Sequence, residues 1–314
     1  MHAAVVTEFG HVPTWQEFDE PTPGPGEVVV DVVAAGLHPR VRSQADGSHY
    51  TSEGALPLVP GVDGVARFPD GSLRYFAVAS DTRGTMAERV AVDPRASVVL
   101  PDGADPVAVA AGANPVMSSW VALRRRITFT PGSRVLVLGA TGASGRAAVQ
   151  VAKHLGASHV VASGRDAGRL ATLTGIGADV VVPLGDAEAV GVAAADVDVV
   201  IDYVWGQPAV DVMRALVTAR ADRGRRLDWV AIGSTAGQEA RIPSAALRAS
   251  GLTIVGSGQG SVGRAAFVAE LPHIVAAIAD GTIGVDATAV RMSDVASAWA
   301  GQSGAGAGRV VLVP

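Results

Sequence analysis

Cysteine is absent from this sequence of 314 residues, and its absence removes three kinds of chemistry at once. The chain can form no disulfide, no thiolate metal site and no cysteine nucleophile. A chain without disulfides fits a reducing cytoplasm. Positive charge is also scarce, since 25 Lys and Arg face 30 Asp and Glu. We therefore expect no nucleic-acid partner, because such binding needs a basic face.

Long hydrophobic runs are missing as well. The most apolar stretches are interrupted by Pro, Gly or Asp well before they reach membrane-spanning length. No basic segment precedes the apolar stretch 2–6, and Glu8 follows it, so the pattern differs from that of a signal peptide. We expect a cytoplasmic protein without membrane association. The 48% of hydrophobic residues can build a large core, and the length suits two domains.

The first third of the sequence is rich in short β-branched runs, which are typical of strands. Turn-forming residues separate them, most clearly at residues 21–26. The runs predicted as strands are 3–7, 27–35, 61–68 and 88–92. Between about 105 and 126 the pattern becomes helical. We expect Pro115 to divide this segment into two helices, because proline lacks the N–H group that a helix interior uses.

From residue 134 onward, apolar strands alternate with helical patterns. These strands are continuous apolar runs, which indicates a parallel sheet covered by helices on both faces. The predicted strands are 135–138, 159–162, 180–182, 197–201, 229–232 and 252–255. Residues after about 260 contain one predicted helix at 265–279 and two short strands. They are too few for a domain, so we expect them to return to the first domain and complete it.

A glycine-rich turn follows the first strand of this alternating region. Its residues are Gly139, Ala140, Thr141, Gly142, Ala143, Ser144 and Gly145. The glycines let backbone N–H groups approach a pyrophosphate at the start of the next helix, where the helix dipole favours an anion. A second strand follows at 159–162. This strand–turn–helix–strand context predicts a dinucleotide site; the alternative is a tight turn without a ligand.

The end of the second strand distinguishes NAD from NADP. An NAD site places an acid there, which accepts a hydrogen bond from the ribose 2′-hydroxyl. This sequence has Ser163, Gly164 and Arg165 instead, and no acid before Asp166. A small donor and an arginine suit the 2′-phosphate of NADPH. We expect Arg169 either to join this contact or to lie on a solvated helix face.

Several motifs carry a resemblance to a known family. In sequence and order, six segments resemble the quinone-oxidoreductase branch of the medium-chain dehydrogenase/reductases. They are 23–28, 34–37, 60–64, the glycine turn, 148–153 and 155–157. The resemblance implies an α/β protein with a GroES-like β-rich catalytic domain and a Rossmann doubly wound parallel sheet. It also implies a cleft at their junction. The expected ranges are 1–112 and 261–314 for the catalytic domain and 113–260 for the Rossmann domain.

The resemblance also bears on metal binding. Alcohol dehydrogenases of this superfamily hold a catalytic zinc with a cysteine and a histidine, where this sequence has His38 and Val62. Their four-cysteine zinc lobe is missing too. Too few ligands remain to retain Zn²⁺, so we expect no metal and no alcohol oxidation. Zinc-free relatives usually carry Asn where His38 stands, which leaves the substrate open.

Hydride transfer needs a bound nicotinamide, an acceptor and a proton source. Loops at the carboxyl ends of the parallel strands should line the nicotinamide end of the pocket. The residues expected there are Tyr203, Trp205, Gly233, Ser234, Ser257, Gly258 and Gln259. Tyr50 is the candidate proton donor, because related 2-enoyl reductases carry a tyrosine at the matching place; an ordinary half-buried tyrosine is the alternative. His38 either acts on the substrate or is a structural histidine.

These features predict an NADPH-dependent, zinc-independent reductase that transfers hydride to a small molecule, either a quinone or an α,β-unsaturated carbonyl. Two alternatives stay open. One is a 2-enoyl thioester reductase, which would need a basic path for the carrier's phosphates. The other is a non-catalytic NADPH-binding protein. We also expect a homodimer, because the apolar strand 252–255 should lie last in its sheet, and an exposed edge invites pairing with a symmetry mate.

Overall fold

The computed structural model describes residues 1–49, 52, 54–78, 80, 82–301 and 308–314. Contacts within the chain divide it into two compact units. Unit 1 consists of Met1–Asn114 and Val268–Pro314, and unit 2 of Pro115–Phe267. The sequence placed these boundaries at 112 and 260.

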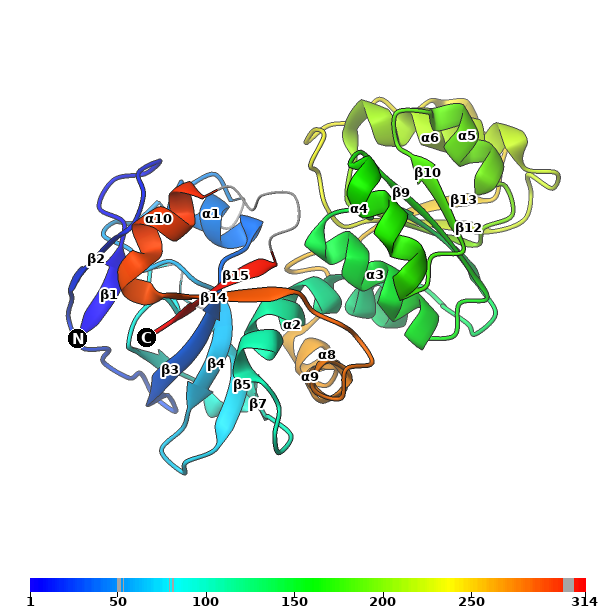
Figure 1. Ribbon diagram of the computed structural model, residues 1–314. Helices are drawn as coiled ribbons and strands as arrows, with labels where there is room; N and C mark the ends of the chain where they lie inside the picture. The colour runs from blue at the N-terminus through cyan, green and yellow to red at the C-terminus, as the bar shows by residue number, and fades with distance from the viewer. Residues whose placement is uncertain (50–51, 53, 79, 81, 302–307) are drawn as a thin grey trace. The chain divides into compact units, whose positions relative to one another are not determined.

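Unit 2 is built on a six-stranded sheet in the order β10-β9-β8-β11-β12-β13, with every neighbouring pair parallel (Figure 1). The chain enters at the centre, builds one half outward, and then returns to build the other. This order confirms the predicted Rossmann doubly wound sheet. The strands are β8 (Arg134–Leu138), β9 (His159–Gly164), β10 (Val180–Pro183), β11 (Val199–Asp202), β12 (Leu227–Ala231) and β13 (Leu252–Gly256).

Helices cover the sheet of unit 2 on both faces. Val190 of α5 and Met213 of α6 pack with Leu136 and Trp229 of the strands in one buried cluster, and α3 lies on the other side of the sheet (Figure 1). Such burial explains why the strands are apolar along their whole length. The helical segments are α3 (Ala143–His154), α4 (Ala167–Thr172), η3 (Leu173–Ile176), α5 (Ala187–Ala193), α6 (Gly206–Ala219) and α7 (Ser244–Arg248).

Unit 1 contains a seven-stranded sheet to which both ends of the chain contribute. Its strands follow the order β14-β15-β3-β4-β5-β7, and β6 pairs with β3. The C-terminal β15 runs antiparallel to β3, which joins the return segment to the first third of the chain (Figure 1). The strands are β3 (Val28–Gly36), β4 (Asp63–Arg67), β5 (Leu73–Ala77), β6 (Arg89–Val92), β7 (Ser97–Val99), β14 (Ala287–Arg291) and β15 (Arg309–Val313).

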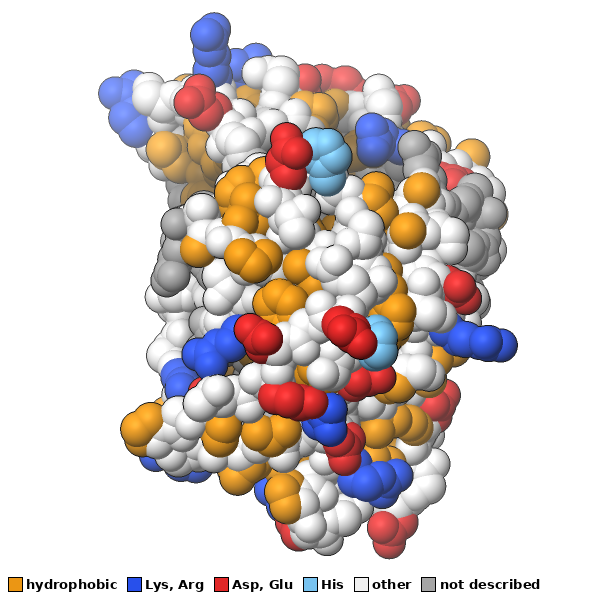
Figure 2. All heavy atoms as spheres, turned by 90° about the vertical axis from the view of Figure 1, so that its left-hand side faces the viewer, with side chains coloured by type: hydrophobic (Ala, Val, Ile, Leu, Met, Phe, Trp, Pro, Cys, Tyr) orange, Lys and Arg blue, Asp and Glu red, His pale blue; other side chains and the backbone are white. Residues whose placement is uncertain are grey.

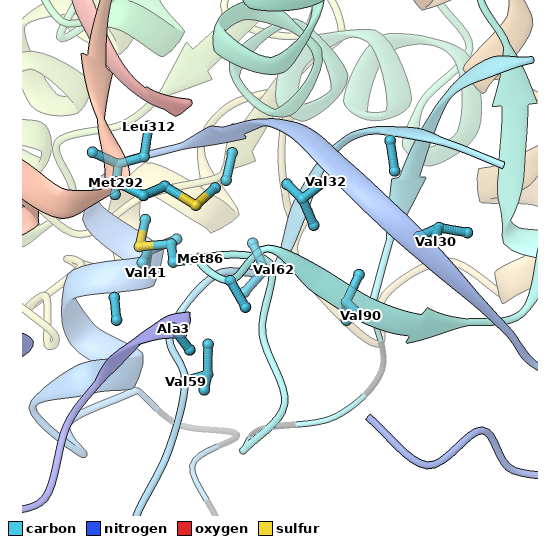
Figure 3. Close-up of a cluster of buried hydrophobic side chains, with 14 of the residues drawn as sticks. Ala3, Val30, Val32, Val41, Val59, Val62, Met86, Val90, Met292 and Leu312 are labelled. Carbon is cyan, nitrogen blue, oxygen red and sulfur yellow. The ribbon is translucent and has the colours of Figure 1, made fainter. Parts of the chain in front are cut away.

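A buried apolar cluster holds unit 1 together. Figure 3 shows Val32 and Val62 of the first segment close to Met86, with Met292 and Leu312 of the return segment beside them. Burial of this surface fixes the return segment on the first part of the unit. A two-stranded sheet completes the strands, with β1 (His2–Val5) and β2 (Thr14–Glu17). The helical segments are α1 (Pro39–Ala45), η1 (Pro94–Ala96), α9 (Leu271–Ala279), η4 (Met292–Asp294) and α10 (Val295–Ala300).

The expected helix break at Pro115 was wrong. Helix α2 (Pro106–Val121) runs through Pro115 and continues into the π-helical turn η2 (Ala122–Arg126). The flanking Ala113 and Val116 are fully buried, and their packing offsets the hydrogen bond that proline removes. The segment Pro106–Arg126 has the length and composition to cross a membrane, yet 72% of its most apolar window is buried inside the protein, as in a core helix.

A second expected helix also differs. Residues 265–279 form two helices, α8 (Arg264–Val268) and α9 (Leu271–Ala279), instead of one. Pro272 stands in the first turn of α9, where its missing N–H is no loss. In one continuous helix its ring would clash with the carbonyl group of residue 268, so the helix divides before it.

Surface features bear on the expected partners. The face drawn in Figure 2 carries positive and negative side chains interspersed among apolar ones. Strand β13 lies at an edge of its sheet, as expected, with Thr253 exposed and Ile254 and Val255 half-buried. The homodimer that this edge suggests stays a prediction.

Candidate functional site

The sheet of unit 2 has a switch point between β8 and β11, where the direction of winding reverses. In open α/β sheets, ligands bind at the carboxyl ends of the strands at such a point. Gly139 follows β8 and Tyr203 follows β11. A side chain added at Gly139 would place its Cβ 3.2 Å from the Cβ of Tyr203. The two turns are therefore in contact, and Gly139 makes that contact possible.

The glycine turn is fixed by the neighbouring strand. The carbonyl oxygen of Ser163 accepts hydrogen bonds from the N–H groups of Gly139 (2.9 Å) and Ala140 (2.8 Å). Gly139 has φ of +82°, a conformation that favours glycine. A Cβ at Gly145 would collide with the carbonyl oxygen of Gly139 and lie 2.6 Å from Ala140 Cα. Gly145 thus lets α3 begin directly against the turn.

The start of α3 is open to a ligand. Gly142 is the N-cap and offers no side-chain hydrogen bond, so first-turn N–H groups lack the usual capping partner. Gly142 and Ala143 are exposed, and Thr141 and Ser144 are half-buried. A 12-residue helix with uncapped, accessible N–H groups is suited to bind a pyrophosphate.

At the end of β9, the residues expected to contact the phosphate differ in their exposure to solvent. Arg165 is exposed, whereas Ser163 is fully buried and its hydroxyl has no hydrogen-bond partner among the described residues. A Cβ at Gly164 would lie 2.5 Å from Thr141 Cγ2, so Gly164 admits the glycine turn. Asp166 caps α4 by accepting a hydrogen bond from the Arg169 N–H at 2.9 Å. The guanidinium of Arg169 also lies 3.8 Å from the Asp166 carboxylate.

Asp202 begins the loop 202–206, which the sequence placed at the nicotinamide end of the pocket, and it organises the turn after β11. Its buried carboxylate accepts hydrogen bonds from the N–H groups of Val204 (2.7 Å) and Trp205 (2.9 Å) and from the indole of Trp229 (2.9 Å). Burial raises the pKa of Asp202, and these three donors oppose the shift. An acid that ends an apolar strand and precedes a turn is the sequence signal for such a role.

Two aromatic residues of this turn were expected to bind the cofactor. Tyr203 is buried, and its hydroxyl lies 2.8 Å from Ser118 Oγ. Burial raises the pKa of Tyr203 to about 12, so it stays neutral near pH 7. Trp205 has φ of +51°, which is strained for a bulky residue, and its side chain packs against the apolar cluster of unit 2. Apolar packing thus accounts for the position of the Trp205 ring.

The remaining expected cofactor loops follow β12 and β13 at the same edge of the sheet. A Cβ at Gly233 would lie 2.9 Å from the carbonyl oxygen of Tyr203, so Gly233 packs on the neighbouring turn. Ser234 is half-buried, Ser257 is buried, and Gly258 and Gln259 are exposed. Arg126 donates hydrogen bonds to the carbonyl oxygens of Gly256 (2.7 Å) and Ser261 (3.0 Å). It thereby ties the glycine-rich loop to the end of helix α2–η2.

Unit 1 contains a buried polar group that the sequence did not reveal as a unit. The Nε2 of His38 lies 3.0 Å from Asp63 Oδ1, and the Tyr75 hydroxyl donates to Asp63 Oδ2 at 2.7 Å. All three residues are at most 2% exposed. The Nδ1 of His38 is also buried and has no hydrogen-bond partner among the described residues. The candidate proton donor Tyr50 lies outside the described residues.

The pKa shifts follow from burial. Burial lowers the pKa of His38 below 6.5, an effect that its hydrogen bond to Asp63 only partly opposes. Burial also raises the pKa of Tyr75 well above its usual value, and the charge of Asp63 adds to this effect. His38 is therefore neutral near pH 7, and its Nε2–H donates to Asp63.

The residues at the expected metal position do not fit zinc. Val62 points into the apolar cluster of unit 1 (Figure 3). The carboxylate of Asp63 is occupied by His38 and Tyr75, and within the described ranges no group of three His, Cys, Asp or Glu could hold a metal ion. The sequence supplies no cysteine either. A tetrahedral zinc site needs at least three protein ligands, which this donor set lacks.

Comparisons with known proteins agree with this architecture. The family model described as zinc-binding dehydrogenase matches residues 143–280. A probable NADPH-dependent quinone reductase of Emericella nidulans is 34% identical, and the alignment covers all of both chains. The NADPH-dependent alkenal/one oxidoreductase of Arabidopsis thaliana chloroplasts is 27% identical over 50% of this chain and 44% of its own length.

A solved structure is similar over its whole length. The quinone oxidoreductase of Thermus thermophilus, whose crystal structures include a complex with NADPH, superposes with a TM-score of 0.85. The two sequences are 27% identical, and the alignment covers all of both chains.

The glycine turn generates a first prediction. Gly145→Ala should destabilise the protein by about 1–3 kcal/mol, because the methyl group collides with backbone atoms that cannot rotate away. Gly142→Ala is the matched control, since its Cβ would meet only the Gly139 carbonyl, at 3.6 Å. It should cost below about 1 kcal/mol of stability, yet weaken binding of the expected cofactor NADPH about tenfold. Urea unfolding and calorimetric titration measure the two effects. Equal stability losses would contradict the assigned packing role.

The buried histidine generates a second prediction. Because the folded-state pKa of His38 is lowered, only the unfolded chain gains this proton readily below pH 6.5. The free energy of unfolding should therefore fall as the pH falls through this range. His38→Asn keeps a donor for Asp63 but does not titrate, so its free energy of unfolding should fall less between about pH 8 and about pH 5.5. Urea unfolding at several pH values tests this. Parallel pH profiles for the two proteins would refute it.

Proposed function

Because this chain belongs to the quinone-oxidoreductase branch of the medium-chain dehydrogenase/reductase superfamily, we propose that it reduces a quinone or an α,β-unsaturated carbonyl with NADPH. It is an oxidoreductase, and NADPH is its cofactor. The acceptor is a small molecule. The observation that carries the proposal is the uncapped start of α3 at the switch point of a doubly wound sheet.

The cofactor site rests on residues of unit 2. The N–H groups at the start of α3 would hold the pyrophosphate, and the glycines leave room for it. At the end of β9 the first acid, Asp166, is engaged as the cap of α4. Arg165 is exposed and carries the charge that a 2′-phosphate needs. The buried hydroxyl of Ser163 contributes only if the local side chains rearrange, so we assign the main phosphate contact to Arg165.

The acceptor chemistry fits a site without a metal. When bound, NADPH supplies a hydride from C4 of its nicotinamide. A quinone or an enone is already electrophilic, so its reduction requires no Lewis acid. The proton must come from water or a side chain, and we propose Tyr50 for this role with an enone. Tyr203 is a poorer donor, because its hydroxyl is buried and bonded to Ser118. We further propose that the protein acts in the cytoplasm as a homodimer.

Turnover tests the proposed function directly. NADPH oxidation should be accelerated by the protein with 1,4-naphthoquinone or an alkyl vinyl ketone as acceptor, and it should persist after treatment with a chelator. Tyr50→Phe should lower enone turnover about a hundredfold while leaving NADPH affinity unchanged. Quinone reduction should survive this change, because the product can take its proton from water. No turnover with a broad panel of acceptors would favour the non-catalytic NADPH-binding alternative.

Cofactor preference generates a further prediction. The wild type should favour NADPH over NADH in kcat/KM by at least about tenfold, since a charge-assisted hydrogen bond contributes about 1.5–3 kcal/mol before screening. Arg165→Ala should reduce this preference, because it weakens the binding of NADPH but not that of NADH. Added salt should also weaken NADPH binding more than NADH binding. Arg214→Ala removes an exposed arginine of α6 and is the matched control. Equal use of both cofactors by the wild type would defeat the assignment.

A further inference from the structure

Three segments of unit 1 meet beside His38. Strand β15 pairs antiparallel with β3 through Val311 and Gly36, and the N–H of Leu37 donates to the Val310 carbonyl at 3.0 Å. The same register places Arg309 opposite His38. Helix α1 begins directly after His38, so Arg40 stands in its first turn. Two arginines from distant parts of the sequence thus flank one buried histidine.

Neither arginine has an ionic or hydrogen-bond partner for its guanidinium among the described residues. Both side chains are half-buried, and the Nε of Arg40 is shielded from solvent without a partner. Burial lowers the pKa of Arg309 to about 10. The charges of Arg309 and Arg40 both lower the pKa of His38, in agreement with the strand register and the start of α1, which bring the two residues near it. Partly desolvated cations without a partner are unfavourable unless an anion joins them.

The neighbouring carboxylate of Asp63 does not supply the anion that both arginines lack. Both oxygens of Asp63 are engaged, one by His38 and one by the Tyr75 hydroxyl. Its single negative charge compensates at most one of the two guanidinium groups. His38 and Tyr75 are neutral near pH 7, because burial shifts their pKa values away from it. One positive charge therefore stays uncompensated in this part of unit 1.

An unpartnered donor supports an anion at this place. The Nε–H of Arg40 is buried and makes no hydrogen bond with any described residue. Buried polar atoms nearly always have a partner in proteins, and an anion would supply the acceptor that this donor lacks. The Nδ1 of neutral His38 is also unpartnered, but it is an acceptor and so suits a hydroxyl group, not the anion itself.

We propose that Arg40 and Arg309 form an anion-binding site beside His38, which holds a negatively charged group of the acceptor. The assignment of this anion to the acceptor rests on the proposed function. A carboxylate, a sulfonate or an ionised quinone hydroxyl has the required charge and the oxygen geometry that guanidinium groups recognise. The preferred acceptor is then an acidic quinone or enone, and neutral acceptors are reduced less efficiently.

A matched pair of acceptors tests the turnover consequence. The wild type should use 1,4-naphthoquinone-2-sulfonate in preference to neutral 1,4-naphthoquinone. Arg40→Gln and Arg309→Gln should each reduce the ratio of the two kcat/KM values by about tenfold, and should leave the neutral quinone within about twofold. Arg309→Lys keeps the charge and should retain most of the ratio. Arg95→Gln, which removes an arginine paired with Asp93, is the control.

Binding of a redox-inert anion separates the site from the catalytic proposal. Calorimetry should show that 2-naphthalenesulfonate binds the wild type and binds each glutamine variant about tenfold more weakly. If binding depends on both arginines but no quinone is reduced, the site stands and the proposed function fails. If quinones are reduced but neither the ratio nor the binding responds to the arginines, the anion site is refuted. An equal loss for the neutral and anionic quinones would refute it as well.

Discussion

The carbonyl oxygen of Ser163 accepts two backbone hydrogen bonds, from Gly139 and Ala140, and the rest of the proposed cofactor site depends on this interaction. It holds the turn after β8 against the end of β9, the neighbouring parallel strand. With the turn fixed, Gly145 brings α3 close to the turn, and the first N–H groups of the helix stay exposed. A side chain at these glycines would close the space that a pyrophosphate needs. One backbone contact therefore connects strand pairing, helix placement and anion binding.

Unit 1 contains a buried group of polar side chains. Beside the expected metal position, His38 and Tyr75 are neutral near pH 7 and donate hydrogen bonds to the Asp63 carboxylate. Nothing in this group can polarise an alcohol oxygen as a metal ion would. A reductase of activated double bonds does not need that help, because its acceptor already withdraws electrons. The polar group and its two flanking arginines can instead recognise the charge of the acceptor.

Local sequence signals predicted the fold well. The apolar strands and the glycine turn of unit 2 are each encoded by neighbouring residues, so the doubly wound sheet could be predicted from them. Pro115 shows the limit of local rules, because a buried helix continues through it. Strand β5, with Tyr75, was missed because its sequence Leu-Arg-Tyr-Phe-Ala has weak alternation and charge. Elements with a clear local sequence signal could therefore be predicted, and elements without one could not.

The side-chain contacts of the candidate sites could not be predicted in the same way. The bond between Ser118 and Tyr203 joins residues 85 positions apart, and Arg309 comes to lie opposite His38 only through the pairing of β15 with β3. Composition and spacing carry no information on such contacts. Likewise, the sequence suggested Ser163 as a phosphate donor, but the structure buries its hydroxyl and uses its carbonyl oxygen. The backbone role of Ser163 depends on tertiary structure and has no local sequence signal.

Hydride transfer from NADPH to a carbon of the acceptor is the central claim, and isotope transfer tests it most directly. The protein is incubated with an α,β-unsaturated ketone and NADPH that carries deuterium at C4, with each of the two C4 positions labelled in turn. Mass spectrometry and NMR then locate the label in the product. The account predicts one deuterium at the β-carbon of the saturated ketone from only one of the two labelled cofactors. An unlabelled product from both cofactors, or the absence of any product, would contradict it.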